Sequence, residues 1–135
     1  MILLIDDLRS FRHEVVSGIE VPIFTARTSE EALTWLNGFI HMHGNTTLPI
    51  DQLWLDHDLG MIPNRGRTSG KEDIEDTTIP FVQELIKLHD EGNHVSINSV
   101  IVHSSNPVGV RNIMNKLRPI YPNITQVDAQ QYFIV

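Results

Sequence analysis

The chain has 135 residues, of which 41% are hydrophobic and 20% are charged, and its formal net charge is -7 at pH 7. This length suffices for one domain with a sizeable core, so we expect a single domain over residues 1–135. The acidic charge balance argues against an extended nucleic-acid-binding surface, which would need a basic face. The chain contains no cysteine, which excludes disulfides, thiolate metal sites and a cysteine nucleophile.

The N-terminal residues form a short apolar run that ends at Asp6 and Asp7. This run has neither the basic leader nor the small-residue cleavage site of a secretion signal. No segment approaches the roughly 18 consecutive apolar residues of a membrane span. We therefore expect a cytoplasmic protein that does not interact with membranes.

The chain begins with two predicted strands and one clear helix. Ile2–Ile5 is a continuous apolar run, which is typical of a strand buried on both faces, and residues 21–26 predict a second strand. Residues 28–42 open with Thr28 or Ser29 as a cap and repeat apolar side chains at helical spacing. The pattern between the two strands is weak, so the first helix is expected to be shortened to a turn or a loop.

The second half continues the alternation. Residues 51–56 and Ser99–Ser105 predict the third and fourth strands, and the second helix is expected to be capped by Thr78. Pro107–Leu117 predicts the third helix, and residues 124–135 supply the last strand or two. Strands that alternate with helices predict a parallel sheet covered by helices on both faces. The expected fold is α/β, with a three-layer, doubly wound and mostly parallel sheet.

Residues 61–77 are the longest polar stretch of the chain and are rich in glycine and charge. Loops of this length within a compact domain usually serve as lids or are disordered insertions. We therefore expect a loop insertion or a lid in this segment.

Acidic side chains follow the first and third predicted strands, at the edge where open α/β sheets bind ligands. Asp6 and Asp7 follow the first strand, and Asp56, His57 and Asp58 follow the third. Carboxylates that meet from separate strands suit a hard divalent cation such as Mg²⁺. The predicted metal ligands are Asp6, Asp7 and Asp56.

Two histidines, His57 and His103, also lie at the ends of predicted strands, at the edge where a ligand would bind. Histidine is the side chain best suited to proton transfer near neutral pH, so the two imidazoles are candidates for an acid and base pair acting on a phosphoester. Each histidine on its own is more commonly a structural hydrogen-bonding group. The candidate catalytic residues are His57, His103, Asp56 and Asp58.

The stretch HSSNPVG, His103–Gly109, indicates an anion site. Ser105 or Asn106 can cap the helix that begins at Pro107, and the free N–H groups of that helix favour a phosphate. An ordinary helix cap is the commoner explanation of such a stretch. Arginines after the first two strands could clamp the same phosphate. The candidate substrate-binding residues are Arg9, Arg27, Ser104, Ser105 and Asn106.

The paired acids, Asp56 and Ser104 together resemble the receiver domain of response regulators, whose fold is flavodoxin-like. The resemblance implies that the paired acids bind magnesium and that Asp56 takes a phosphoryl group. The lysine that ends the fifth strand in that family has no counterpart, because residues 124–135 contain no lysine.

The chain more closely resembles the cyclic-phosphate-processing receiver domains. Four motifs occur in the order of that family over residues 1 to about 118: DDLR, RTSEEA, DHDLG and HSSNPVG. The resemblance implies a role in handling terminal or cyclic phosphates of RNA or nucleotides. The segment 61–77 departs from the family pattern.

Three functions remain open. The first is a metal-assisted phosphoesterase that acts on a cyclic or terminal phosphate of a nucleotide or RNA. The second is a nucleotide-binding module that sequesters such a molecule without turnover. The third is a receiver switch phosphorylated on Asp56, which the missing lysine disfavours. The enzyme is placed narrowly first, because receiver chemistry does not require histidines at strand ends and proton transfer does.

Overall fold

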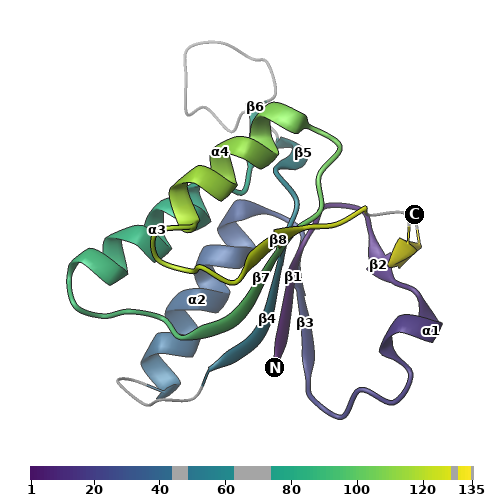
Figure 1. The fold of residues 1–135 in the computed structure, drawn as a ribbon, viewed down its shortest axis with the longest axis horizontal. Helices are drawn as coiled ribbons and strands as arrows, with labels where there is room; N and C mark the ends of the chain where they lie inside the picture. Colours follow the sequence, from purple (N-terminus) through teal and green to yellow (C-terminus); the bar gives the residue numbers. More distant parts are fainter. Residues whose placement is uncertain (44–48, 63–73, 129–130, 135) are drawn as a thin grey trace.

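The computed structural model describes residues 1–43, 49–62, 74–128 and 131–134. Its centre is a five-stranded sheet in the order β3-β1-β4-β7-β8, in which all neighbouring strands are parallel. This arrangement confirms the expected receiver-like α/β fold, and Figure 1 shows it. The strands are β1 (Ile2–Ile5), β3 (Ile23–Ala26), β4 (Ile50–Leu55), β7 (Ile97–Val102) and β8 (Ile124–Gln126).

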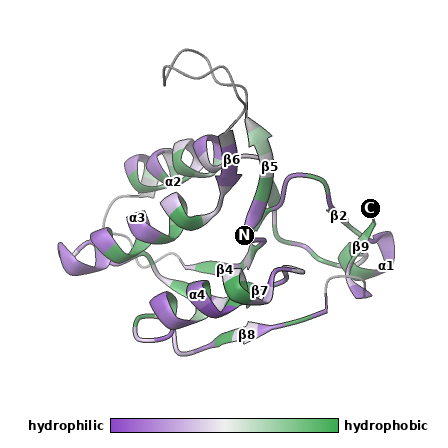
Figure 2. Cartoon of the chain, turned by 90° about the horizontal axis from the view of Figure 1, so that it is seen from above, coloured by the Kyte–Doolittle hydropathy of each residue, from purple (hydrophilic) through white to green (hydrophobic). Residues whose placement is uncertain are grey.

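Three long helices cover one face of this sheet: α2 (Ser29–His43), α3 (Ile79–Asp90) and α4 (Pro107–Leu117). Each is amphipathic, as the mixed colouring of Figure 2 shows, because apolar side chains recur at helical spacing. They pack against alternate side chains of the strands, which form one buried cluster with them. Representative members are Leu3, Leu53 and Val102 from the sheet and Leu36, Leu85 and Ile113 from the helices.

The opposite face carries a much thinner layer than the expected helical one. A two-stranded antiparallel ribbon of β2 (Ser10–Phe11) and β9 (Phe133–Ile134) lies there, and its aromatic rings pack on Trp54. The first helix, α1 (His13–Val16), is a single short turn with no buried residue. The prediction of a shortened first helix is therefore confirmed, and the aromatic ribbon takes over the covering of this face.

A hairpin of β5 (Asp58–Ile62) and β6 (Ile74–Thr77) rises from the carboxyl end of β4. A loop was predicted over residues 61–77, but its two ends belong to the antiparallel strands β5 and β6, so the prediction is wrong there. Residues 63–73 lie outside the described part of the chain. Asp76 fixes the hairpin to the start of α2, since its carboxylate accepts hydrogen bonds from the Ser29 N–H at 2.8 Å and hydroxyl at 2.6 Å.

The expected caps of α2 and α3 differ in their hydrogen bonds. Thr28 caps α2, because its hydroxyl accepts a hydrogen bond from the Glu31 N–H at 3.0 Å. Thr78 is the N-cap residue of α3, as expected, but its hydroxyl makes no capping hydrogen bond. The Thr78 backbone N–H instead donates to the His57 carbonyl, and the hydroxyl is buried without a partner among the described residues.

Within the described ranges, none of the helices has both the length and the apolar character that crossing a membrane requires.

Candidate functional site

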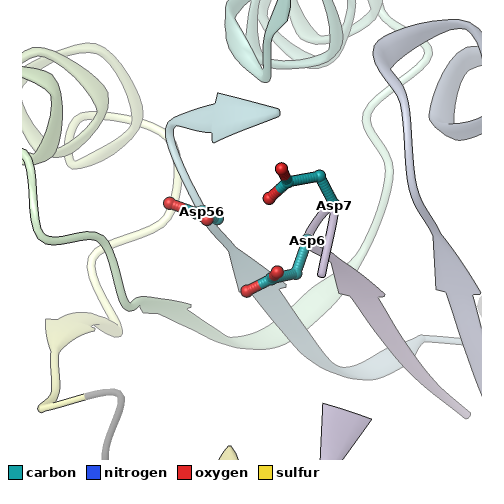
Figure 3. A group of neighbouring side chains, drawn as sticks. All are labelled: Asp6, Asp7 and Asp56. Atoms are coloured by element: carbon teal, nitrogen blue, oxygen red, sulfur yellow. The ribbon is translucent and has the colours of Figure 1, made fainter. Parts of the chain in front are cut away.

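Three carboxylates gather where β1 and β4 end. The two strands are parallel neighbours, so their carboxyl ends meet at the same edge of the sheet. One oxygen from each of Asp6, Asp7 and Asp56 lies within 4.8 Å of the others, and Figure 3 shows the three neighbouring side chains at the ends of the strands. We call these residues the acidic cluster. The structure therefore brings the three sequence-predicted metal ligands together.

Asp6 is the most heavily bonded member of the acidic cluster. Its Oδ1 accepts hydrogen bonds from the backbone N–H groups of Leu8 at 3.0 Å and Arg9 at 2.8 Å. Its Oδ2 lies 3.1 Å from Nε2 of His103. Burial opposes ionisation of Asp6, but the hydrogen bonds from His103, Arg9 and Leu8 outweigh this effect and lower its pKa. Asp6 is thus a carboxylate held ionised inside the protein.

The other two members of the acidic cluster are disfavoured as anions. Burial, and then the charge of Asp6, raise the pKa of Asp56, although Ser104, His103 and Arg9 act in the opposite direction. Burial also raises the pKa of Asp7, and Asp6 adds to that increase. A hard cation with oxygen ligands would relieve this repulsion, so the donor set fits Mg²⁺ or a similar divalent ion.

Arg9 lies beside the acidic cluster. Its Nη1 is 3.7 Å from Asp6 Oδ2 and 3.9 Å from Asp56 Oδ2, and it donates a hydrogen bond to the His103 carbonyl at 3.3 Å. The Arg9 side chain remains 23% exposed, so it is partly accessible from solvent. Arg9 therefore adds a positive charge at the point where an anionic ligand would approach the carboxylates.

Arg27 has a different environment from the one expected of a phosphate clamp. Its Nη1 donates to the carbonyls of Asp6 and Arg9, and its Nη2 donates to the Ser10 hydroxyl at 3.0 Å. These contacts hold the loop that follows β1 and carries the paired acids. The sequence alone gave no signal for this role, because the carbonyls that Arg27 binds belong to residues far away in the chain.

His103, the second candidate catalytic histidine, is fully buried. Its N–H donates to the Leu55 carbonyl, which extends the strand pairing one residue beyond β7. Strand alternation then places His103 on the same face as Trp54, against the rings of Trp54 and Phe133. Its Nδ1 has no partner among the described residues, and its Nε2 meets Asp6.

His57 lies in a more open position and is paired with its neighbour. Its Nδ1 is 2.8 Å from Oδ1 of Asp58, and the two side chains are 14% and 41% exposed. The Asn106 side-chain nitrogen lies 3.4 Å from both Asp58 oxygens and 3.5 Å from His57 Nδ1. Histidine rings are oriented by such a carboxylate, which selects the ring nitrogen that carries the proton. We call these two residues the His57–Asp58 pair.

The remaining predicted residues surround the start of α4. Asn106 caps this helix, as expected, because its side-chain oxygen accepts a hydrogen bond from the Gly109 N–H at 3.0 Å. The Ser104 hydroxyl accepts a hydrogen bond from the Asn106 N–H at 3.2 Å, and Ser105 is exposed. Gly109 is the last residue of the HSSNPVG motif, but the sequence alone assigned it no function.

Comparison with known protein families identifies the family of this chain. A family model described as the cyclic-phosphate processing receiver domain matches residues 1–119. No curated protein and no solved structure matches the chain. The matched residues include the acidic cluster, the three long helices and all strands of the five-stranded sheet except β8, namely β3, β1, β4 and β7. The chain therefore belongs to the family of cyclic-phosphate processing receiver domains.

Proposed function

We propose that this domain is a metal-assisted phosphoesterase that acts on a cyclic or terminal phosphate of a nucleotide or RNA end. The observation that carries the proposal is the acidic cluster, whose oxygens lie within 4.8 Å of one another at the carboxyl edge of the sheet. The family to which the chain belongs, described as cyclic-phosphate processing, supports the choice of substrate.

The acidic cluster would hold the divalent cation, and Mg²⁺ fits its all-oxygen donor set. A bound cation would supply Lewis-acid polarisation of a phosphoryl oxygen. Of the two candidate arginines, Arg9 is the better placed to contact a phosphate, since its Nη1 lies beside Asp6 and Asp56 and its side chain is partly exposed. Arg27 is assigned to holding the loop after β1, because its Nη atoms already bind that loop.

His57 is the candidate general base. With the proton of neutral His57 on Nδ1, where it is donated to Asp58, the lone pair resides on Nε2. In hydrolysis, Nε2 takes a proton from the attacking water, the new phosphorus–oxygen bond forms, and one phosphate ester bond breaks. The leaving oxygen then receives a proton from solvent. His103 acts through Asp6, because it is buried and its Nε2 binds that carboxylate.

Hydrolysis of a panel of cyclic and terminal nucleotide phosphates, followed by phosphorus NMR, tests the proposal. We expect turnover that requires a divalent cation and that falls by about 10²- to 10⁴-fold in His57→Ala. His13→Ala is the matched control, because His13 is an exposed histidine on α1, away from the acidic cluster. Tight binding without turnover would favour a sequestering module, and labelling of Asp56 by acetyl phosphate without turnover would favour a receiver switch.

A further inference from the structure

The imidazole of His57 occupies the space where residue 109 would carry a side chain. A Cβ placed on Gly109 would lie 2.4 Å from Cγ of His57, 2.7 Å from Cδ2 and 2.8 Å from Nδ1. These separations are far shorter than van der Waals contact, and Cγ is the ring atom closest to the backbone, so a small rotation cannot relieve them. The ring therefore packs directly on the backbone of the first turn of α4.

The start of α4 also makes a polar contact with the His57–Asp58 pair. Asn106, which caps α4 through Gly109, also places its side-chain nitrogen 3.4 Å from both oxygens of Asp58. Its two polar atoms thus face different partners, since the oxygen accepts from the helix and the nitrogen lies against the carboxylate. The His57–Asp58 pair and the start of α4 are consequently held as one unit.

We propose that the first turn of α4 is the mount that fixes the His57 ring, with Gly109 and Asn106 as positioning residues. This inference rests on the proposed function for its catalytic meaning, and it adds α4 to a site otherwise built from β1 and β4. Asp58 fixes Nδ1, Asn106 fixes Asp58, and Gly109 leaves room for the ring. A side chain at residue 109 would push the ring away from its bond to Asp58.

A double-mutant cycle on thermal unfolding tests the steric part of the mount. Alanine is a better helix former than glycine, so Gly109→Ala would stabilise α4 if no atom occupied the space of the added Cβ. We expect Gly109→Ala to lower the melting temperature when His57 is present and to raise it in the His57→Ala background. Gly38→Ala is the control, because a Cβ at Gly38 in α2 would meet no atom within 4 Å. It should raise the melting temperature in both backgrounds.

The double-mutant cycle still tests the inference if Gly109→Ala alone does not fold. In that case the double variant His57→Ala/Gly109→Ala should fold, because the clashing ring has been removed. A double variant that is also unfolded, or a Gly109→Ala effect of the same sign with and without His57, would overturn the inference.

Nitrogen NMR of the imidazole rings gives a readout that a purely structural role would not change. At alkaline pH, where imidazoles are neutral, wild-type His57 should carry its proton on Nδ1. Gly109→Ala should shift this signal toward the Nε2-protonated form, and Gly38→Ala should not. Unchanged His57 signals in folded Gly109→Ala would contradict the mount.

Kinetics link the mount to the proposed chemistry. Gly109→Ala should reduce kcat by about 10²-fold with a smaller change in KM, because a displaced base mainly affects the chemical step. An unchanged kcat, together with displaced ring signals, would overturn the positioning role. If the wild type hydrolyses nothing, the proposed function fails, while the unfolding cycle and the ring signals still decide for or against the mount.

Discussion

Nε2 of His103 lies 3.1 Å from Oδ2 of Asp6, and neither side chain is more than 1% exposed. The imidazole therefore supports the carboxylate from within the protein, while the acidic cluster faces the edge of the sheet. A buried carboxylate that loses its hydrogen-bond donor suffers the full cost of desolvation. The two histidines therefore differ in environment, since buried His103 binds Asp6 and partly exposed His57 pairs with Asp58.

Replacing His103 by alanine should destabilise the domain. Asp6 would lose a buried donor, which typically costs roughly 1–3 kcal/mol, and a cavity would open beside Phe133. Chemical denaturation measures the free energy of unfolding, with exposed His13→Ala as the control. Equal stability of the two variants would show that the contact between His103 and Asp6 contributes nothing.

Replacing Asp56 by asparagine should stabilise the domain at neutral pH. Burial and the charge of Asp6 raise the folded-state pKa of Asp56 above its ordinary value of 3.8. For such a group, stability falls as the pH rises from the unfolded value through the folded one, because the folded state retains the proton longer. Asparagine cannot ionise and so avoids the loss of stability that ionised Asp56 causes. The melting temperature of Asp56→Asn should therefore exceed that of the wild type by a few degrees at neutral pH, and the two should become equal in acid.

The control for this experiment is Glu20→Gln, which removes one negative charge from an exposed position. If both variants show the same dependence of melting temperature on pH, the effect comes from net charge rather than from the acidic cluster.

The same Asp56→Asn variant should bind Mg²⁺ more weakly. It loses one anionic oxygen of the three that converge, and even changes in residues around metal ligands cost roughly 10- to 100-fold in affinity. Calorimetric titration of the wild type, Asp56→Asn and Glu20→Gln measures this loss. Equal affinities in all three proteins would rule out a role for Asp56 in holding the cation.

Asp76 links the hairpin to α2, and Asp76→Ala should break that link. The Ser29 N–H and hydroxyl would both lose their acceptor, at a cost of about 1–2 kcal/mol. Hydrogen exchange should increase at the start of α2 and in β6. Glu75→Ala on the same strand is the control, because Glu75 is exposed. Equal exchange in both variants would show that Asp76 is not the link.

Much of the sheet and the acidic cluster could be predicted from local sequence. The apolar run Ile2–Ile5 is buried on both faces, as a central parallel strand requires. Because parallel strands end at one edge, acids that follow separate strands were expected to meet, and Asp6 and Asp56 do meet.

Features that depend on distant parts of the chain could not be predicted. β2 and β9 have two residues each and pair Phe11 with Phe133, so neither strand shows a periodicity of its own. The burial of His103 depends on the β2–β9 ribbon, because Phe133 from the far end of the chain packs against its ring. The contact between His57 and Gly109 depends on how α4 is placed on the sheet.

Hydrolysis in heavy-oxygen water tests the central claim most directly. A cyclic nucleotide phosphate is incubated with the wild type and Mg²⁺, and phosphorus NMR follows the isotope shift of the product. The account predicts a phosphate monoester that carries heavy oxygen bonded to phosphorus, formed much more slowly by His57→Ala and not formed without a divalent cation. An unchanged cyclic phosphate, or heavy oxygen on the sugar rather than on phosphorus, would contradict it.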